Sequence, residues 1–138
     1  MTNASEILAA ARRRGLEQLD RWVAEGILVD AAEASRLRGT DVTSSPSEGL
    51  VLIVHRGSVR YLASVLELEA AAVASVNRHL AHASDSQRLI WWRRPHGALG
   101  GLSIVEGIRT GRIERCIELA RAYADERLAG DGTNSVGQ

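Results

Sequence analysis

The chain of 138 residues, with 45% hydrophobic and 25% charged residues, is long enough for one compact domain and is not disordered by composition. Its formal net charge of +0 lacks the global basic signature of a strong nucleic-acid binder, so DNA binding has to be argued from local patches. The sequence has a single cysteine and no run near the roughly 20 apolar residues that span a bilayer. At the N-terminus the positive charges follow a short apolar run, which is the reverse of the order in a secretory signal peptide. These features favour a cytoplasmic protein that contacts no membrane.

The first predicted element is an amphipathic helix within a unit that spans residues 1–26. We expect Ser5 to cap this helix and Gly26 to end it in the left-handed conformation. Apolar residues recur along it at helical spacing, at Leu8, Ala11, Leu19, Trp22 and Val23. We interpret Arg12–Arg14 as a solvated face of the helix, with a phosphate-binding patch as the alternative. Because the apolar stripe has no obvious partner, the helix is a candidate dimerisation element, and we expect a homo-oligomer.

The next unit, residues 27–63, has the order of elements of a winged helix-turn-helix. Asp30 is placed to cap a short helix that ends at Gly39. The second helix of such a motif would follow, but the sequence there is TDVTSSPSEG, which is polar and is interrupted by Pro46. Since a helix interior tolerates proline poorly, this element is predicted to have one or two turns at most. The recognition helix is therefore degenerate and carries no arginine.

A β-hairpin is predicted at the position of a wing. The β-branched run Leu50–Val54 and the segment Val59–Leu62 flank the tight-turn sequence HRGS. The tip of this hairpin is expected to present His55, Arg56 and Arg60. If the unit binds DNA, arginines would contact the phosphates, namely Arg36, Arg38, Arg56 and Arg60. A scaffold or dimerisation role for the unit is the alternative.

The remaining chain is predicted to be a helical domain of residues 64–129 followed by a flexible tail of residues 130–138. Ser84 or Asp85 is placed to cap one helix, and Pro95 prevents its simple continuation beyond the tryptophans. The predicted helices cover residues 63–83 (one amphipathic helix of about five turns), 85–92, 103–109 and 112–129. The expected fold class is therefore mainly α with one small β-hairpin, a degenerate winged helix-turn-helix followed by a helical domain.

The stretch LIWWRRPHGALGG combines two adjacent tryptophans with an Arg-Arg-Pro break and a glycine-closed turn. Neighbouring helix positions point about 100° apart, so one of Trp91 and Trp92 is expected in the core while the other packs under the turn or faces a partner. Arg93, Arg94 and His96 lie at the break beside them. Tryptophan and arginine are enriched at interface hot spots, which favours a partner-binding surface here.

No sequence pattern indicates catalysis or a cofactor. The motifs GxGxxG, GxSxG, the P-loop and paired CxxC do not occur, and no nucleophile, base and oxyanion donor can be grouped. His79 and His82 lie three residues apart on a predicted helix, which is compatible with a metal ion, but a partly exposed histidine pair is the preferred interpretation. Cys116 lies on the apolar stripe of the last helix and is interpreted as a buried structural thiol. We expect neither an enzyme nor a metal or cofactor site.

The segment WWRRPHGALGGLSIVEGIRTGRIERCIELARAYA resembles the C-terminal toxin-binding domain of Xre/MbcA/ParS-type antitoxins. That domain has a tryptophan or similar residue ending a helix, a short turn, Leu-Gly-Gly, a small helix, a glycine break and a closing helix. The resemblance covers roughly residues 85–124 and, more loosely, an excisionase-like helix-turn-helix and hairpin upstream. Ser103 and Ile104 stand where many members have a proline. The matching framework positions are Trp92, Pro95, Leu99, Gly100, Ile104, Val105, Gly111 and Ile117.

The resemblance implies a bacterial antitoxin of a type II toxin-antitoxin system, which binds and neutralises a cognate protein toxin, often a RES-type enzyme that consumes NAD. It also implies that the protein can bind operator DNA and repress its own operon through the upstream module. The residues expected in or beside the contact with the toxin are Trp91, Arg93, Arg94, His96, Leu99, Gly100, Arg109 and Arg112. A winged-helix transcriptional regulator without a toxin partner is the alternative.

Overall fold

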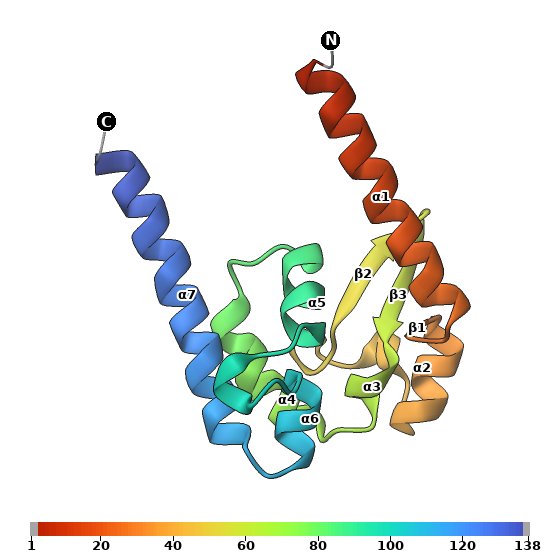
Figure 1. Cartoon of the computed structure of the whole chain (residues 1–138). Coiled ribbons are helices and arrows are strands. Elements are labelled where there is room, and N and C mark those ends of the chain that lie inside the picture. The colour runs from red at the N-terminus through yellow and green to blue at the C-terminus, as the bar shows by residue number, and fades with distance from the viewer. Residues whose placement is uncertain (1–2, 137–138) are drawn as a thin grey trace.

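The computed structural model of the chain describes residues 3–136, and it places side chains in their surroundings for residues 3–127. The described chain is mainly helical, as expected, and contains a small antiparallel sheet (Figure 1). The α-helices are α1 (Ala4–Ala24), α2 (Ala31–Arg38), α3 (Ala63–Leu66), α4 (Ala70–Asn77), α5 (Asp85–Arg93), α6 (Ile104–Arg109) and α7 (Ile113–Val136). The strands are β1 (Leu28–Val29), β2 (Leu52–His55) and β3 (Ser58–Leu62). Short 3-10 helices are η1 (Val42–Ser44), η2 (Ser47–Gly49), η3 (Arg78–Leu80) and η4 (Gly97–Leu99).

The sheet has the strand order β1-β3-β2, with β3 antiparallel to both neighbours. Strands β2 and β3 form the predicted hairpin, in which Leu52 pairs with Tyr61. Arg56 and Gly57 at its tip both have positive φ, 50° and 77°, as a type I′ turn requires. Strand β1 is an addition to the predicted hairpin, because its two residues are too few to show a strand period in the sequence.

Each face of the sheet covers a separate apolar cluster, because successive strand residues point to opposite sides. Leu62 and its partner Leu28 join the main core, which also holds both tryptophans of α5 and residues of α4, α6 and α7. Tyr61 packs on the other face, in a smaller cluster with residues of α2, η1 and α3. The sheet thus separates a main core from a smaller one.

Helix α2 confirms the predicted capped helix of the second unit. The Asp30 side chain accepts a hydrogen bond from the Glu33 amide at 2.9 Å, and Gly39 ends the helix with a φ of 83°. The segment around Pro46 contains two separate 3-10 turns, η1 and η2. The predicted limit of one or two turns is therefore confirmed, and residues 40–50 contain no α-helix.

The single long helix predicted for residues 63–83 is wrong, because the chain divides there into α3, α4 and η3. Glu69 adopts an extended backbone between α3 and α4, with φ −62° and ψ 131°. The physical reason is packing: Leu66 and Val73 are seven residues apart and would share one side of a continuous helix, but Leu66 packs in the smaller cluster and Val73 packs in the main core with Val65. One straight helical stripe cannot serve two cores on different sides of the sheet, so the chain bends between them.

Helix α5 begins where the sequence predicts, α6 begins one residue later than predicted, and both have the same kind of cap. Ser84 and Ser103 each accept a hydrogen bond from the amide three residues on, and the side chains of Gln87 and Glu106 bond back to the cap amides. Helix α7 continues through residues 130–136, where the sequence predicts a flexible tail, and residues 137–138 of that tail lie outside the described residues.

The predicted cap of the first helix, Ser5, is wrong by two residues. Asn3 caps α1 instead, because its side chain accepts a hydrogen bond from the Glu6 amide at 2.8 Å. Gly26 follows the helix with a φ of 76°, as predicted. Ser5 is therefore an ordinary residue of the first helical turn.

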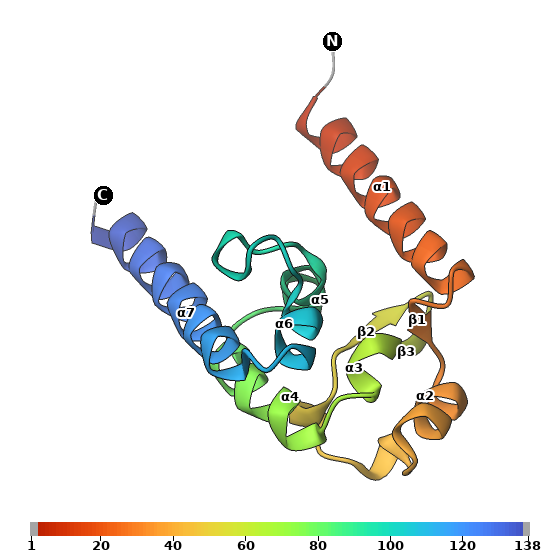
Figure 2. The ribbon, with the colours of Figure 1, turned by 60° about the horizontal axis from the view of Figure 1, so that its bottom comes forward.

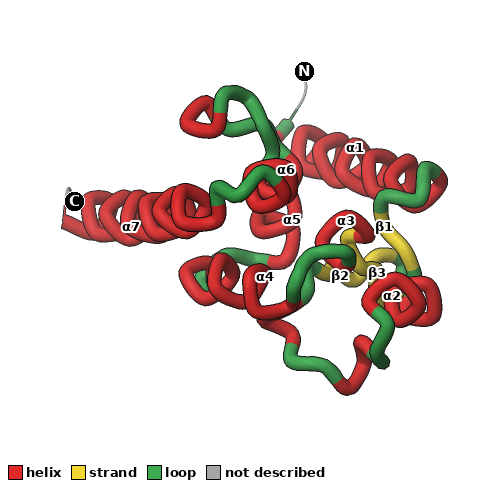
Figure 3. The backbone as a smooth tube through the Cα atoms, turned by 90° about the horizontal axis from the view of Figure 1, so that it is seen from below, coloured by secondary structure: helices red, strands yellow, loops and turns green. Residues whose placement is uncertain are grey.

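Helix α1 is held to the body near its C-terminal end. Leu19, Trp22 and Val23 pack against the main core, but no residue of α1 is fully buried. The first turns of α1 and the last turns of α7 extend away from the body on the same side (Figure 1, Figure 2). Seen from below, α1 and α7 lie on opposite sides of the body, with α5 and α6 between them (Figure 3). The surface around α5 therefore lies between two projecting helices.

Candidate partner-binding surface

Both tryptophans of the predicted contact stretch lie in the main core. Trp91 is 2% exposed and Trp92 is 0% exposed, and their rings meet edge to face with centroids 6.1 Å apart. The Trp91 ring also lies against Tyr123 of α7, with centroids 6.2 Å apart. The two side chains therefore join α5 to the rest of the core and leave almost no ring surface for a partner.

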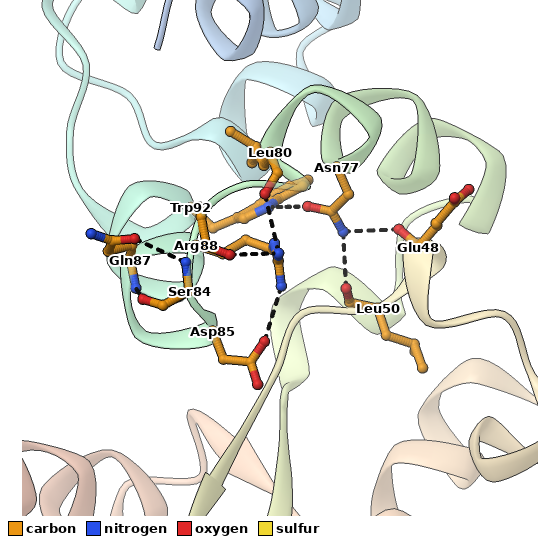
Figure 4. A network of polar contacts seen from close by, with 10 residues as sticks. Glu48, Leu50, Asn77, Leu80, Ser84, Asp85, Gln87, Arg88 and Trp92 are labelled. Carbon is orange, nitrogen blue, oxygen red and sulfur yellow. Dashed lines mark hydrogen bonds and ion pairs between the residues drawn. The ribbon is translucent and has the colours of Figure 1, made fainter. Parts of the chain in front are cut away.

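A buried amide fixes the position of Trp92 (Figure 4). Trp92 Nε1 donates to Oδ1 of Asn77 at 2.9 Å, and Nδ2 of Asn77 donates to the carbonyl oxygens of Glu48 and Leu50 at 2.8 and 2.9 Å. Each polar atom of the Asn77 and Trp92 side chains thus has a partner, as burial requires. The network connects α4 and α5 to the segment that leads into β2.

Arg88 makes a second connection at the start of α5 (Figure 4). Its guanidinium donates to the carbonyl oxygens of Leu80 and Ala83 at 3.1 and 3.0 Å, and it pairs with Asp85 at 3.1 Å. The connection between η3 and α5 is therefore satisfied internally, and both ends of α5 are fixed to the body.

The turn after α5 is closed by its own backbone and by His96. The His96 amide donates to the Leu102 carbonyl oxygen at 3.0 Å, and the Gly101 amide donates to the His96 carbonyl oxygen at 2.9 Å. The His96 ring is 7% exposed, and its Nε2 lies 3.0 Å from the carbonyl oxygen of Trp91. Since a carbonyl only accepts, Nε2 carries the hydrogen of the neutral ring. Burial is the main cause that lowers the pKa of His96, and the neighbouring Arg94 also lowers it.

Leu99 and Gly100 shape the same turn and the packing below it. Leu99 is 1% exposed, and Gly100 has a φ of 67° that reverses the chain. A Cβ atom at Gly107 of α6 would lie 2.8 Å from Sγ of Cys116 and 3.0 Å from Cδ1 of Leu99. Cys116 is 0% exposed and burial raises the pKa of its thiol, which confirms the predicted buried cysteine. Close approach of α6 and α7 therefore requires glycine at position 107.

Arg94 is exposed on this fixed turn, and basic side chains gather near it. The guanidinium carbons of Arg94 and Arg127 each lie 5.9 Å from the centroid of the Tyr123 ring. A pocket of about 270 Å³ beside that ring is also lined by His79 and His82. No carboxylate lines this pocket, and none of these basic side chains forms an ion pair within residues 3–127. We call Tyr123 together with Arg94, Arg127, His79 and His82 the Tyr123 patch.

The other arginines of the predicted toxin contact have partners within the chain. Arg93 is half-buried, with its guanidinium carbon 4.6 Å from the centroid of the Trp22 ring. Arg109 pairs with Glu67 at 2.7 Å. Arg112 is exposed and donates to a carbonyl oxygen of η4 at 3.4 Å. Of the eight residues predicted to contact a toxin, the structure therefore brings Arg94 alone into the Tyr123 patch.

Two of the arginines predicted for DNA contact are engaged within the second unit. Arg38 is half-buried and donates to the carbonyl oxygens of Gly49 and Leu66 at 2.9 and 3.1 Å. Burial lowers the pKa of Arg38. Arg36 is exposed and forms an ion pair with Glu33. Arg38 thus fixes α2 to η2 and α3.

The other two arginines belong to the hairpin, whose tip is tied to α1. Arg56 donates two hydrogen bonds to the carboxylate of Asp20, at 2.8 and 2.7 Å, and Nε2 of His55 lies 2.7 Å from the same carboxylate. The bond with Arg56, followed by that with His55, holds the pKa of Asp20 well below its usual range. His55 is 5% exposed, so the expectation that the tip presents it is wrong, because its ring packs toward α1. Arg60 is half-buried, and its Nε has no partner among the described residues.

The sequence reasoning did not identify Asn77, Gly107 or Asp20, which hold this surface together. Asn77 interrupts an apolar stripe, and a buried polar interruption of that kind is a detectable sign of a hydrogen-bond network. Gly107 stands inside a predicted helix, which is a sign of close packing. Asp20 carries no sequence signal, because its partners lie 35 residues away or more.

His79 and His82 belong to the patch rather than to a recognisable metal centre. His79 is half-buried and His82 is exposed. Among the described residues, no three or more histidine, cysteine, aspartate or glutamate side chains gather closely enough to hold a metal ion. The pair therefore contributes imidazole side chains to the Tyr123 patch.

Comparisons of the chain with protein-family models, curated proteins and solved structures found no match. The family resemblance therefore depends on the motif residues of the sequence. Within residues 3–136, no helix combines the length and the apolar character that crossing a membrane requires.

Proposed function

We propose that the chain is an antitoxin that binds a cognate protein toxin and neutralises it, with the Tyr123 patch in the contact surface. The observation that carries this proposal is the patch itself, where Arg94 and Arg127 flank one aromatic ring without any ion pair within residues 3–127. The resemblance to Xre/MbcA/ParS-type antitoxins supports a toxin as the partner.

The physical properties of the patch suit recognition of an acidic protein surface. Tyrosine and arginine are enriched at interface hot spots, and unpaired cations attract carboxylates and speed the encounter. Arg94 begins a turn that His96 and the buried Trp91 hold in one conformation. Because the backbone of this turn is already ordered, binding of a partner to Arg94 carries a lower entropic cost.

The proposed partner is an enzyme of the RES type that consumes NAD, as the resemblance implies. Binding would neutralise such a toxin by covering the route to its active site. Repression of the operon stays a prediction, because Arg36, Arg38 and Arg56 all have partners within the chain. A winged-helix regulator that acts only on DNA is therefore less well supported than a toxin-binding protein.

Co-purification with the product of the neighbouring gene tests the proposal. We expect the tagged wild-type chain to retain that product, and Arg94→Glu to weaken binding by at least about tenfold, which is 1.4 kcal/mol. Arg121→Glu is the matched control, since Arg121 is exposed on α7 two residues from Tyr123 and therefore faces another side of the helix. Failure of the wild-type chain to bind would contradict the proposal, as would equal effects of the two substitutions.

A further inference from the structure

An apolar groove separate from the Tyr123 patch lies between α1 and α5. Its volume is about 460 Å³. Its apolar lining comes from three elements: Leu16, Leu19 and Trp22 of α1, Ile53 of β2, and Leu89 and Ile90 of α5. Leu16 is 41% exposed and Ile90 is 51% exposed, so large apolar side chains face solvent from both walls. Apolar side chains gathered in a recess are typical of a binding surface, whereas single exposed ones are not.

The apolar surface continues from the groove along the free end of α1. Ile7 and Leu8 are each 56% exposed. Leu8 precedes Leu19 by 11 residues, which is close to three full helical turns, so both lie on the same side of the helix. The turns that carry Leu8 extend beyond the body in Figure 1. A rod-shaped apolar partner can therefore contact the groove and the projecting turns together.

The edge of the groove carries an arginine and no carboxylate. Arg12 lines the groove and is exposed, whereas Arg14, two residues further on, faces another side of α1. Arg12 forms no ion pair within residues 3–127, and no carboxylate lines the groove. Asp20 lies on the same helix, but its carboxylate is occupied by Arg56 and His55. The charges therefore favour a partner that carries carboxylates beside its apolar residues.

A second copy of the chain is a poorer occupant of this groove. The side of α1 that carries Leu8, Leu16 and Leu19 also carries Arg12 and no carboxylate, so a second copy would bring an arginine rather than a carboxylate to the groove. This argues against α1 as the dimerisation element that its apolar stripe suggests. A homo-oligomer formed through α1 is therefore an outcome of the test rather than the proposal.

The groove and the Tyr123 patch are close enough for one partner to contact both. The amide of Arg94, which directly follows α5, donates to the carbonyl oxygen of Ile90 at 2.9 Å, so the two residues are one helical turn apart. Ile90 lines the groove, and Arg94 belongs to the patch. Helix α5 therefore presents an exposed edge that leads from one surface to the other.

We infer that the α1–α5 groove binds an apolar helical segment of the toxin that carries acidic residues along the edge facing Arg12. This inference rests on the proposed function and adds a second contact to it. Helices laid in apolar grooves commonly bind through side chains three and four residues apart. The carboxylates of the segment would pair with Arg12 at the rim, and its apolar side chains would cover Leu16 and Ile90.

Titration calorimetry of the full-length chain with the product of the neighbouring gene tests the inference. We expect Leu16→Glu and Ile90→Glu each to weaken binding by at least about tenfold, because both place a carboxylate in the apolar contact. Ala10→Glu is the matched control on α1, since Ala10 lies half a helical circumference from Leu19. Arg12→Ala should weaken binding and reduce its salt dependence. Thermal unfolding of each variant establishes that the fold is retained.

The outcomes separate this inference from the proposed function. If the wild-type chain does not bind the toxin, both are wrong. If Arg94→Glu weakens binding but Leu16→Glu and Ile90→Glu act like Ala10→Glu, the groove inference alone is wrong. It is also wrong if the groove substitutions abolish a homodimer in sedimentation, or if they abolish binding to phosphatidylglycerol vesicles while toxin affinity is unchanged.

Discussion

At the scale of single residues, Asn77 is the side chain on which the contact region depends most. It supplies the partner of the buried Trp92 indole and satisfies two carbonyl oxygens. Asn77→Ala is expected to lower the free energy of unfolding by roughly 2 to 4 kcal/mol, because buried polar groups then lack partners. Urea unfolding measures the change. Ser75→Ala on the same helix is the control, expected to cost less than about 1 kcal/mol, and equal costs for the two variants would contradict the role of Asn77.

Gly107 supports a second prediction at the same scale. Gly107→Ala places a Cβ within 2.8 Å of Cys116 Sγ, so α6 and α7 must separate. We expect a loss of about 1 to 3 kcal/mol in thermal unfolding, partly restored by adding Cys116→Ala. Gly97→Ala, where a Cβ would meet nothing within 4 Å, should be close to neutral. A Gly107→Ala variant as stable as the wild type would show that α6 and α7 can accommodate the additional Cβ.

The burial of a residue was predictable where one pattern of the sequence, such as an apolar stripe on a helix, determines it. Cys116 lies on an apolar stripe and is buried, as expected. The residues that contact a partner were less predictable. Trp91, His96 and Leu99 are residue types that occur at interfaces, but they are buried within the chain. Composition does not distinguish a tryptophan that packs inside from one that faces a partner, since both environments are apolar.

At the scale of elements, the turn after α5 should be sensitive to acid. Burial lowers the pKa of His96 below its ordinary value of 6.5, so the unfolded chain binds a proton more readily than the folded turn. The stability contributed by the neutral ring is present above pH 6.5 and is lost as the pH falls below that value through the folded pKa. Urea unfolding between pH 7 and 5 should therefore show a steeper loss for the wild type than for His96→Gln. Parallel profiles would contradict this account.

The tie between α1 and the hairpin is a second element-scale feature. Asp20→Asn removes the charge that holds Arg56 and His55, so α1 should separate from the hairpin more often. We expect faster hydrogen exchange of amides in the C-terminal half of α1. Glu17→Gln is the control, because Glu17 is exposed and forms no ion pair within residues 3–127. Unchanged exchange in Asp20→Asn would show that apolar packing alone holds the helix.

Elements with local signals were predicted from the sequence, and elements fixed by distant contacts were not. Helices α2 and α5 have caps that the sequence displays. The break between α3 and α4 has no such local signal, because it depends on two apolar clusters on opposite faces of the sheet. Strand β1 depends on pairing with β3, in which Leu28 pairs with Leu62 and Val29 with Tyr61, far along the chain.

At the scale of the whole molecule, α5 lies between two projecting helices and carries exposed residues of both proposed contacts (Figure 1, Figure 3). Its buried side is fixed by Trp91, Trp92 and Arg88. Its exposed side leads from Ile90 in the groove to Arg94 in the Tyr123 patch. A neutral net charge thus conceals two local surfaces whose arginines lack ion pairs within residues 3–127.

The most direct measurement of the central claim is growth of cells that produce the neighbouring gene product with and without this chain. Neutralisation predicts that the gene product alone stops growth and that the wild-type chain restores it. Arg94→Glu should restore growth poorly at equal protein levels, whereas Arg121→Glu should restore it fully. A gene product without toxicity, or growth that the wild-type chain does not restore, would contradict the account.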